Sequence, residues 1–363
     1  MQTQASQSIL SLMSSLVENI KGQHLAAVLH DKGSALSVEH RQTPAPGPAE
    51  LLVEVRSVAL NPIDWKQRAS GFHIAGYPTV LGSDVAGIVL SAGPAVPADA
   101  PKPGSRIAAF ASAFFTEGDP NYGALQTRVI VPAANAVPLP EEMSFDEGAL
   151  LPMAVATAWS GWYSIGIPRD TSYTPADKKA FLVWGGASSV GGGAVQLAAS
   201  MGFSVYATAS EKHHEYLKTL GAKRLFDYRD EHVVGAIVKA AQADGVHLQL
   251  AFDAVGALQS CQEILKELNP NGSAKLASAT PLLPDSPKMD GVETNFVLAP
   301  TDGEKLTEFF HFVFGVWLKE KLATGEYVPS PRIKVIEGGL ESTNKALDEL
   351  QGGVSGTKLV LHI

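Results

Sequence analysis

The stretch of sequence that decides the fold reads Phe181-Leu-Val-Trp-Gly-Gly-Ala-Ser-Ser-Val-Gly191, followed by Val205-Tyr-Ala-Thr-Ala-Ser210. An apolar run, a glycine-rich turn, a helical segment and a second apolar run in this order predict the first half of a βαβ unit. In such units the turn and the helix N-terminus hold the pyrophosphate of a dinucleotide. The stretch therefore favours a redox enzyme.

The glycine turn departs from the G-x-G-x-x-G pattern at one position. The spacing begins at Gly186 and ends at Gly191, but Ser188 stands where a middle glycine would let the backbone approach the phosphates. A serine hydroxyl can still donate to a phosphate, and the following helix offers unpaired backbone N–H groups. The alternative is a tight turn in an ordinary α/β domain that binds no ligand.

The residues after the second strand indicate which nicotinamide cofactor to expect. A free ribose 2′-hydroxyl is usually met by Asp or Glu here, whereas a 2′-phosphate needs hydroxyls and cations. The chain has Ser210-Glu211-Lys212-His213 at this place, and Tyr228 ends the next predicted strand, so we expect NADPH rather than NADH. Glu211 would repel a phosphate unless it points to solvent or Lys212 offsets its charge. Alternatively, Lys212 and His213 are only the solvated start of a helix.

Composition narrows the class of protein. A chain of 363 residues, of which 45% are hydrophobic, exceeds what one core usually supports and predicts two domains. A net charge of −9 without a basic stripe argues against nucleic-acid binding. No run approaches the ~18 apolar residues of a membrane span. The single cysteine, Cys261, fits a reducing compartment, most simply the cytoplasm.

The pattern of elements changes along the chain. Short apolar runs between proline- and glycine-rich loops predict a small all-β, barrel-like domain, with strands at 25–29, 51–59, 85–89 and 106–110. A long apolar helix at 151–162 leads to a second domain. There, helices alternate with strands near 181–185, 203–208, 224–228, 248–254 and 273–279, which predicts a doubly wound parallel sheet. The tail, with strands at 332–336 and 358–363 around a helix, is expected to return to the first domain.

Several segments together resemble the medium-chain dehydrogenase/reductase superfamily, over essentially all of residues 25–363. They are the nucleotide turn, Ala59-Leu-Asn-Pro-Ile-Asp-Trp-Lys66, Gly82-Ser-Asp-Val-Ala-Gly-Ile-Val89, Pro103-Gly-Ser-Arg-Ile107, Gly123-Ala-Leu-Gln-Thr127 and Leu151-Pro-Met-Ala-Val-Ala-Thr157. The resemblance implies an α/β fold in which a GroES-like β-barrel catalytic domain joins a doubly wound Rossmann NADP-binding domain. It also implies the boundaries 1–24 for an N-terminal extension, 25–153 for the catalytic domain, 154–300 for the Rossmann domain and 301–363 for the C-terminal return. The extension has apolar residues at helical spacing over 8–20 but no targeting signal, and we expect it to be frayed rather than a docking helix.

Many members of that superfamily use zinc, but this chain lacks their ligands. The family's Gly-His-Glu is here Gly82-Ser83-Asp84, and the first cysteine ligand falls near Asn61. A structural four-cysteine cluster is ruled out because Cys261 is the one cysteine of the chain. Zinc chemistry needs Cys or His donors at tetrahedral spacing, so we expect no metal and a zinc-independent enzyme.

Among zinc-free members, the chain is similar to the fungal stand-alone enoyl reductases that work with polyketide synthases, and to quinone reductases. The shared features are the proline-containing insertion at 166–175, Phe226-Asp-Tyr228, Ile336-Glu-Gly-Gly339 and Ser355-Gly-Thr-Lys358. This similarity implies NADPH as cofactor, a small-molecule or acyl-carrier-bound substrate, a polyketide synthase as partner, and a monomer or homodimer.

The resemblance also implies site residues. Lys66 and Thr157 are placed at the substrate and the nicotinamide. The residues implied for the cofactor are Gly186, Ala187, Ser188, Ser189 and Val190 at the pyrophosphate, Ser210, Lys212, His213 and Tyr228 at the adenosine phosphate, and Ser278, Ala279, Val354 and Ser355 elsewhere along it. Trp159 replaces the small residue expected on its helix, which bears on the width of the substrate tunnel.

The expected reaction is conjugate reduction of an enoyl thioester or enone. NADPH would give hydride to the β-carbon, while Lys66 and Thr157 stabilise the enolate oxygen or bind the nicotinamide ribose. Lys66 is also a candidate proton donor if a cleft buries it. Alternatively, Asp64 and Lys66 are a solvated pair, and Thr157 bonds back to the carbonyl four residues earlier. Two other functions remain open, a quinone or carbonyl reductase and a non-catalytic partner of a synthase.

Overall fold

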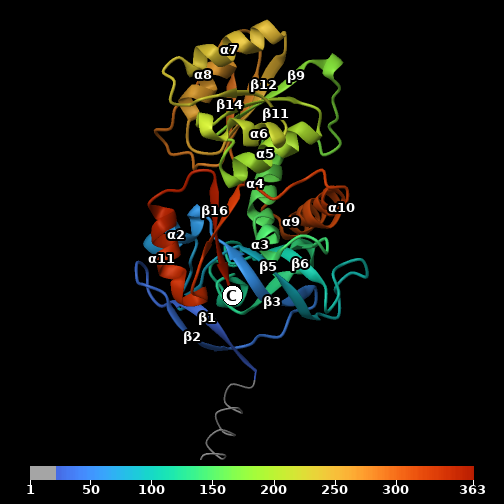
Figure 1. The fold of residues 1–363 in the computed structure, drawn as a ribbon, viewed down its shortest axis with the longest axis vertical. Coiled ribbons are helices and arrows are strands. Elements are labelled where there is room, and N and C mark those ends of the chain that lie inside the picture. The colour runs from blue at the N-terminus through green and yellow to red at the C-terminus, as the bar shows by residue number, and fades with distance from the viewer. Residues whose placement is uncertain (1–21) are drawn as a thin grey trace, which may run out of the picture. The chain divides into compact units, whose positions relative to one another are not determined.

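The computed structural model describes residues 22–363 (Figure 1). The predicted extension, with its apolar run at 8–20, lies outside the described residues except for its last three positions, and β1 (Gln23–Leu29) already begins at Gln23. The chain forms two compact units. The first contains the residues up to Pro138 with Val335–Gly352 and Leu359–Ile363, and the second contains Leu139–Lys334 with Gly353–Lys358. The domain boundaries expected from the sequence differ from the limits of these two units, and they remain a proposal.

The first unit is built from antiparallel strands, as expected of the GroES-like domain. Its elements are β1, β2 (Ser37–Gln42), β3 (Glu50–Ala59), α2 (Pro62–Ser70), β4 (Thr79–Val80), β5 (Asp84–Ala92), β6 (Arg106–Phe110), β7 (Arg128–Pro132), β8 (Ala136–Pro138) and α11 (Thr343–Gln351). The strands form one sheet in the order β2-β1-β4 and another in the order β15-β16-β3-β5-β6-β8, in which β7 pairs with β3. The predicted tail strands are therefore present as β15 (Arg332–Ile336) and β16 (Thr357–His362), although the first residues of each strand, up to Lys334 and Lys358, are counted in the second unit.

The second unit contains a six-stranded sheet in the order β11-β10-β9-β12-β13-β14, and all its pairings are parallel. The strands are β9 (Lys179–Trp184), β10 (Ser204–Thr208), β11 (Ala222–Phe226), β12 (His247–Asp253), β13 (Ala274–Ser278) and β14 (Val292–Phe296). Numbered from β9, this is the order 3-2-1-4-5-6 of the doubly wound dinucleotide fold. The predicted fold class is confirmed.

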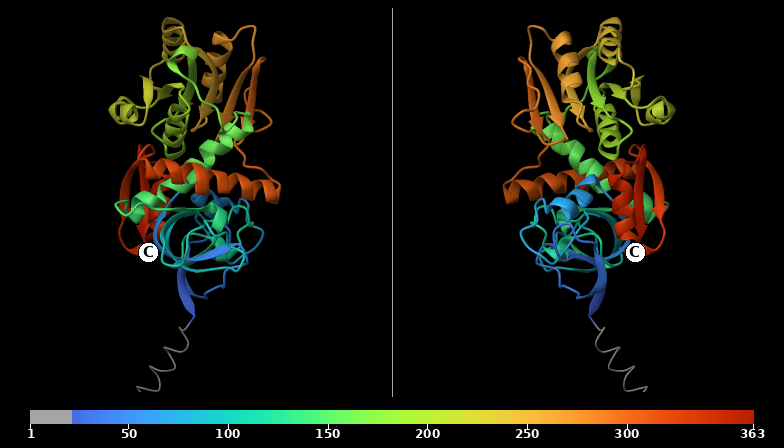
Figure 2. Two further views of the ribbon diagram at one scale, coloured as in Figure 1. Left: turned by 90° about the vertical axis from the view of Figure 1, so that its right-hand side faces the viewer. Right: turned by 90° about the vertical axis from the view of Figure 1, so that its left-hand side faces the viewer.

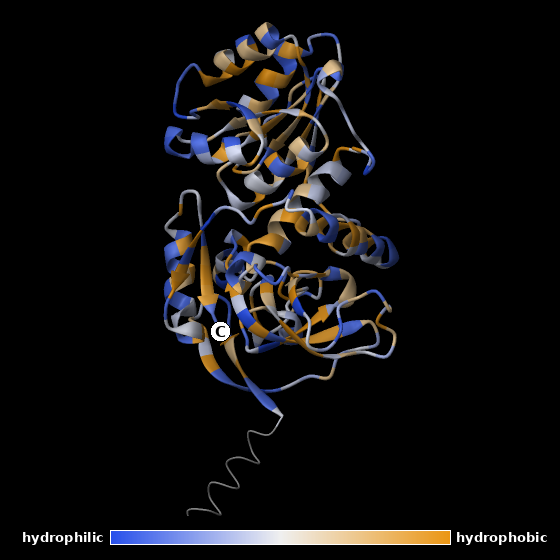
Figure 3. Cartoon of the chain, turned by 45° about the vertical axis from the view of Figure 1, so that its right-hand side comes forward, coloured by the Kyte–Doolittle hydropathy of each residue, from blue (hydrophilic) through white to orange (hydrophobic). Residues whose placement is uncertain are grey.

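Helices α4 (Leu151–Ser164), α5 (Ser189–Ser200), α6 (His214–Thr219), α7 (Val233–Asp244) and α8 (Leu258–Leu268) pack against this sheet, and helices cover both of its faces (Figure 2). The other helices of the unit are α3 (Phe145–Ala149), α9 (Gly303–Phe310), a π-helix η5 (His311–Leu318) and α10 (Lys319–Ala323). Strands sandwiched in this way are apolar throughout rather than alternating. In β9, every residue from Ala180 to Trp184 is buried (Figure 3 shows hydrophobic residues in orange).

Two features of the sheet differ from the sequence-based expectation. The strand expected at 224–228 ends at Phe226, so Tyr228 lies in the turn after it. The sixth strand, β14, was not predicted, because its interior is Glu293-Thr-Asn295 and its apolar residues stand at the two ends. No helix among residues 22–363 is both long and apolar enough to cross a membrane.

Candidate functional site

The carboxyl edge of the parallel sheet gathers most of the predicted cofactor residues. The strand order reverses between β9 and β12, where neighbouring connections leave toward opposite faces of the sheet. Trp184 at the end of β9 pairs with Thr208 of β10 on one side and Asp253 of β12 on the other. Ligands of doubly wound folds bind at such a switch point, outside the carboxyl ends of the strands.

The glycine turn between β9 and α5 has no room for side chains at its two ends. Gly185 has a φ of +84°, and a Cβ on Gly191 would lie 2.2 Å from the carbonyl oxygen of Gly185. A Cβ on Gly186 would lie 3.3 Å from Ala207 and Leu217, which is also tight. The turn therefore depends on glycine for the close approach of strand and helix.

Ser188 is the N-cap of α5. Its hydroxyl accepts a hydrogen bond from the Gly191 N–H (3.0 Å) and donates to the Gly185 carbonyl (2.8 Å). The hydroxyl that the sequence offered to a phosphate is thus already used inside the turn. The hydroxyl of Ser189 is buried and has no hydrogen-bond partner within residues 22–363. Ser189 and Val190 open the helix, where backbone N–H groups lack helical acceptors, so an anion at this end of α5 would find free donors.

The end of β10 carries the residues predicted for the adenosine phosphate. The Ser210 hydroxyl donates to the Tyr228 oxygen at 3.4 Å, so these two predicted residues lie together. Asp227 stands close by, since one of its oxygens accepts the backbone N–H of Glu211 (3.3 Å). Its charge is compensated by Arg229, whose guanidinium hydrogen-bonds to it and lowers the pKa of the Asp227 carboxyl.

His213 connects this region with the tail of the chain. Its Nε2 lies 3.0 Å from the hydroxyl of Ser355, which brings together two predicted residues 142 positions apart. Burial lowers the pKa of His213, and the positive charges of Lys212, Arg332 and His214 lower it further. Arg332 lies more than 100 positions from His213 in the sequence, so no sequence pattern links the two residues.

Asp253 is a second residue that the sequence did not predict for this site. It is fully buried at the end of β12, and its Oδ1 accepts the N–H groups of Val255 and Gly256 at 3.1 and 2.9 Å. Its Oδ2 is buried without a partner among the described residues. The one available signal was a charged residue at the end of an apolar strand, beside the switch point.

The predicted pair at the end of β13 lies next to Asp253. Ser278 is opposite Asp253 in the sheet, and the Ala279 N–H donates to the Asp253 carbonyl at 2.9 Å. The Ser278 hydroxyl donates to the Thr280 carbonyl (2.8 Å). Val354, by contrast, is exposed on the tail segment beside Ser355.

Lys66 lies on α2 of the first unit, and its side chain is exposed. The burial that would favour Lys66 as proton donor is therefore not found, and its ammonium lies 5.7 Å from the centre of the Trp65 ring. Asp64 is not part of a solvated pair, because it is fully buried and accepts the Asn61 N–H (2.7 Å) at the start of the helix.

At two positions where the resemblance places zinc ligands of the family, this chain has side chains that are hydrogen-bonded to each other. The Asn61 side-chain amide donates to Asp84 at 2.8 Å, and both residues are buried. Among residues 22–363, no three His, Cys, Asp or Glu side chains come together in a way that could hold a metal ion.

Thr157 is half-buried on α4, in the second unit. Two residues later, the Trp159 ring is buried edge-on against Phe312 (5.0 Å between centroids) and Trp317 (5.5 Å), both on η5. The Trp159 indole N–H has no hydrogen-bond partner in the described part of the chain. The large residue noted in the sequence is thus part of an aromatic cluster.

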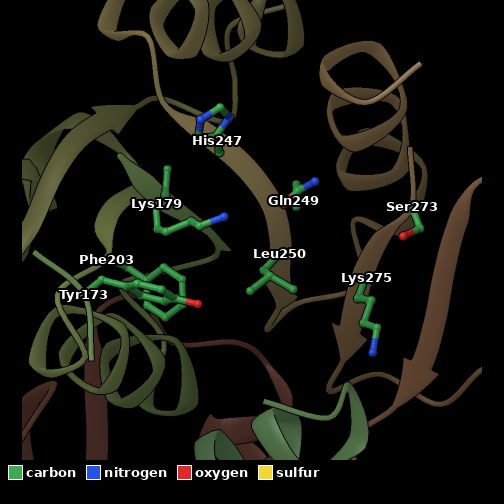
Figure 4. A pocket seen from close by; sticks show the side chains of 9 residues that line it. Tyr173, Lys179, Phe203, His247, Gln249, Leu250, Ser273 and Lys275 are labelled. Atoms are coloured by element: carbon green, nitrogen blue, oxygen red, sulfur yellow. The ribbon is translucent and has the colours of Figure 1, made fainter. Parts of the chain in front are cut away.

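A cavity of about 230 Å³ lies at the opposite, amino-terminal edge of the same sheet (Figure 4). Lys179 and His247 begin two of the strands that line it, and Tyr173 and Phe203 form an aromatic wall. None of the predicted site residues lines this cavity. It is therefore separate from the carboxyl edge of the sheet.

Comparison with known proteins agrees with this architecture. Residues 47–141 match the family model of the alcohol dehydrogenase GroES-like domain, and residues 189–289 match that of the zinc-binding dehydrogenases. The chain is 47% identical over 344 residues to the trans-enoyl reductase tndF of Aspergillus flavipes, covering 94% of this chain and 99% of the relative. It is 49% identical over 278 residues to the trans-enoyl reductase tazE of Aspergillus terreus, covering 76% of this chain and 91% of that one.

A solved structure shares the fold. The CurK enoyl reductase superposes with a TM-score of 0.71 at 20% identity, covering 94% of this chain and 99% of that one. The chain therefore belongs to the medium-chain dehydrogenase/reductase superfamily, in the group of the fungal trans-enoyl reductases.

Proposed function

We propose that the chain is an NADPH-dependent reductase that reduces the activated C=C bond of an enoyl thioester or enone during the synthesis of a polyketide or related secondary metabolite. The observation that carries this proposal is the 47% identity, over 94% of the chain, to a protein named as a trans-enoyl reductase. The carboxyl edge of the second unit supports it, because free donors gather there at a switch point of the sheet.

The residues present fit a phosphorylated dinucleotide. The unpartnered Ser189 hydroxyl and the first N–H groups of α5 suit a pyrophosphate. Gly191 leaves the turn the space it needs, since any Cβ there would meet the Gly185 carbonyl. Ser210, Lys212, His213 and Tyr228 offer hydroxyls and positive charge where an NAD site would have a free carboxylate. We therefore infer NADPH rather than NADH.

A reduced nicotinamide, when bound, supplies the hydride that adds to the β-carbon of the substrate, and the C=C bond is reduced as a proton joins the α-carbon. The chain has to position the substrate and stabilise negative charge on the thioester oxygen. Thr157 is the proposed hydroxyl donor, because its side chain is half-buried and has no hydrogen bond to the other described residues. Lys66 is the proposed cation, whose positive charge would stabilise the negative charge on the thioester oxygen. We leave the proton donor unassigned, because the structure exposes Lys66.

Zinc independence is part of the proposal. The hydrogen bond between Asn61 and Asp84 occupies the place where the superfamily's ligands would stand. An amide and a carboxylate bonded to each other are a poor match for the Cys and His donors of catalytic zinc. We further infer a cytoplasmic enzyme that takes its substrate free or from the acyl carrier of a partner polyketide synthase.

A substrate screen tests the proposal. NADPH oxidation is followed with an enoyl thioester, an enone, a quinone and an aldehyde, and we expect turnover with the first two. Turnover of quinones alone would instead indicate a quinone reductase. Cofactor binding with no turnover of any acceptor would indicate a non-catalytic partner of a synthase. Thr157→Val and Lys66→Met should each lower kcat at least tenfold and leave the dissociation constant of NADPH within twofold.

A further inference from the structure

We propose that Arg332 is a further residue that selects the phosphorylated cofactor, and that the tail segment Gly353–Lys358 holds His213 in place beside it. This inference rests on the proposed function, because it takes a nicotinamide dinucleotide to lie along the carboxyl edge of the sheet. It adds to the predicted site a cation from β15, more than 100 positions away in the sequence from Lys212 and His213.

Three cationic groups lie close enough to His213 to lower its pKa further after burial. They are those of Lys212, Arg332 and His214. Neither Lys212 nor Arg332 forms an ion pair with any residue in the range 22–363. Unpaired cations grouped together in a chain of net charge −9 form a local site for a multivalent anion.

The neighbouring carboxylates do not cancel this charge. Asp227 is bound by Arg229, which takes up its negative charge. Glu215 is bound by Lys218 at 2.5 Å. The third neighbouring carboxylate is that of Glu211, and its side chain is exposed to solvent. The positive charge near Ser210 therefore exceeds the unpaired negative charge, which favours binding of a dianion such as a ribose 2′-phosphate.

A ring contact positions Arg332. Its guanidinium carbon lies 5.9 Å from the centre of the Tyr216 ring, within the range of a cation–π contact. Tyr216 belongs to α6, which directly follows the turn of Glu211–His213. The contact thus places the Arg332 head group beside α6, the helix that follows the segment carrying Lys212 and His213.

Two contacts with the tail hold the His213 ring in place. Ser355 is hydrogen-bonded to its Nε2, and a Cβ on Gly356 would lie 2.3 Å from its Cε1. Gly356 also has a φ of +60°, which favours glycine. The tail and the imidazole therefore fit together only with glycine at this position.

The first experiment measures cofactor affinity by calorimetry on the full chain, with NADPH and NADH as separate titrants. We expect Arg332→Gln to weaken NADPH binding roughly tenfold, Arg332→Lys to weaken it less, and NADH binding to be unchanged in both. Lys239→Gln is the matched control, because it removes an exposed cation on α7 of the second unit that has no ion pair within residues 22–363.

The possible results separate the two proposals. If the wild type binds NADPH and Arg332→Gln binds it equally well, or weakens NADPH and NADH alike, Arg332 has no selective role and the proposed function stands. If the wild type binds neither NADPH nor 2′,5′-ADP, the proposed cofactor is wrong and the role of Arg332 fails with it.

The second experiment tests the tail. Gly353 and Gly356 both have positive φ, but a Cβ on Gly353 would have nothing within 4 Å, whereas one on Gly356 would collide with His213. Both alanine variants carry backbone strain, and only Gly356→Ala displaces the imidazole. We expect Gly356→Ala to lose at least fivefold more NADPH affinity than Gly353→Ala, with no such difference for NADH. Equal losses in the two variants would overturn the role of the tail.

Discussion

Gly191 is the residue at which the glycine turn tolerates least change. A Cβ there would lie 2.2 Å from the Gly185 carbonyl, so alanine must push α5 away from β9. We expect Gly191→Ala to lower the free energy of unfolding by about 1–3 kcal/mol and to weaken NADPH binding. Gly235→Ala is the control in α7, where the new Cβ has nothing within 4 Å; it should stabilise by about 0.5–1 kcal/mol. Urea denaturation measures both, and equal effects would rule out the contact as the cause.

The sequence predicts which residues lie at the carboxyl edge of the sheet better than it predicts the hydrogen bonds that each side chain makes. Gly186 and Gly191 follow from spacing, because a tight turn between a strand and a helix needs them. The internal use of the Ser188 hydroxyl depends on where the Gly185 carbonyl points, which spacing does not reveal. Arg332 was missed for a related reason, since only tertiary structure brings it near His213. Asp253 could have been noticed as a charged residue at the end of a predicted apolar strand.

At the scale of the element, the two serines at the start of α5 are expected to have different roles, Ser188 in stability and Ser189 in cofactor binding. Ser188 caps the helix, so Ser188→Ala should cost about 1 kcal/mol of unfolding free energy. Ser189 has a buried hydroxyl without a partner among the described residues, so Ser189→Ala should cost no stability and still weaken NADPH binding severalfold. Denaturation and calorimetry on both variants test this. A loss of stability in Ser189→Ala equal to that in Ser188→Ala would contradict the assignment.

Strands of the parallel sheet could be predicted from the sequence where both of their faces are buried, because such strands are continuous apolar runs. β9 was found within two residues of its bounds for this reason. β14 lies at the edge of the sheet beside β13, and its polar interior Glu293-Thr-Asn295 forms no such run. The strand expected at 224–228 ends at Phe226 for a similar reason. This strand, β11, is the other edge strand of the sheet and is partly exposed, so its sequence marks its bounds less clearly.

At the scale of the whole molecule, His24 links the stability of the first unit to pH. It is buried in β1 and hydrogen-bonded to the Gln126 side chain at 2.7 Å, and burial lowers the pKa of His24 below the usual 6.5. Between the lowered pKa and 6.5, the unfolded chain binds more protons than the folded one. The free energy of unfolding therefore rises with pH in this window and falls on acidification.

Calorimetric melting between pH 7.5 and 5.5 measures this dependence. We expect the melting temperature to fall as the pH decreases, and His24→Gln to flatten the slope while lowering stability at neutral pH through the lost hydrogen bond. His232→Gln is the matched control, since its side chain is 82% exposed, and it should keep the wild-type slope. If His24→Gln keeps that slope as well, the acid sensitivity arises elsewhere, because no proton would then be exchanged at the buried imidazole as the first unit unfolds.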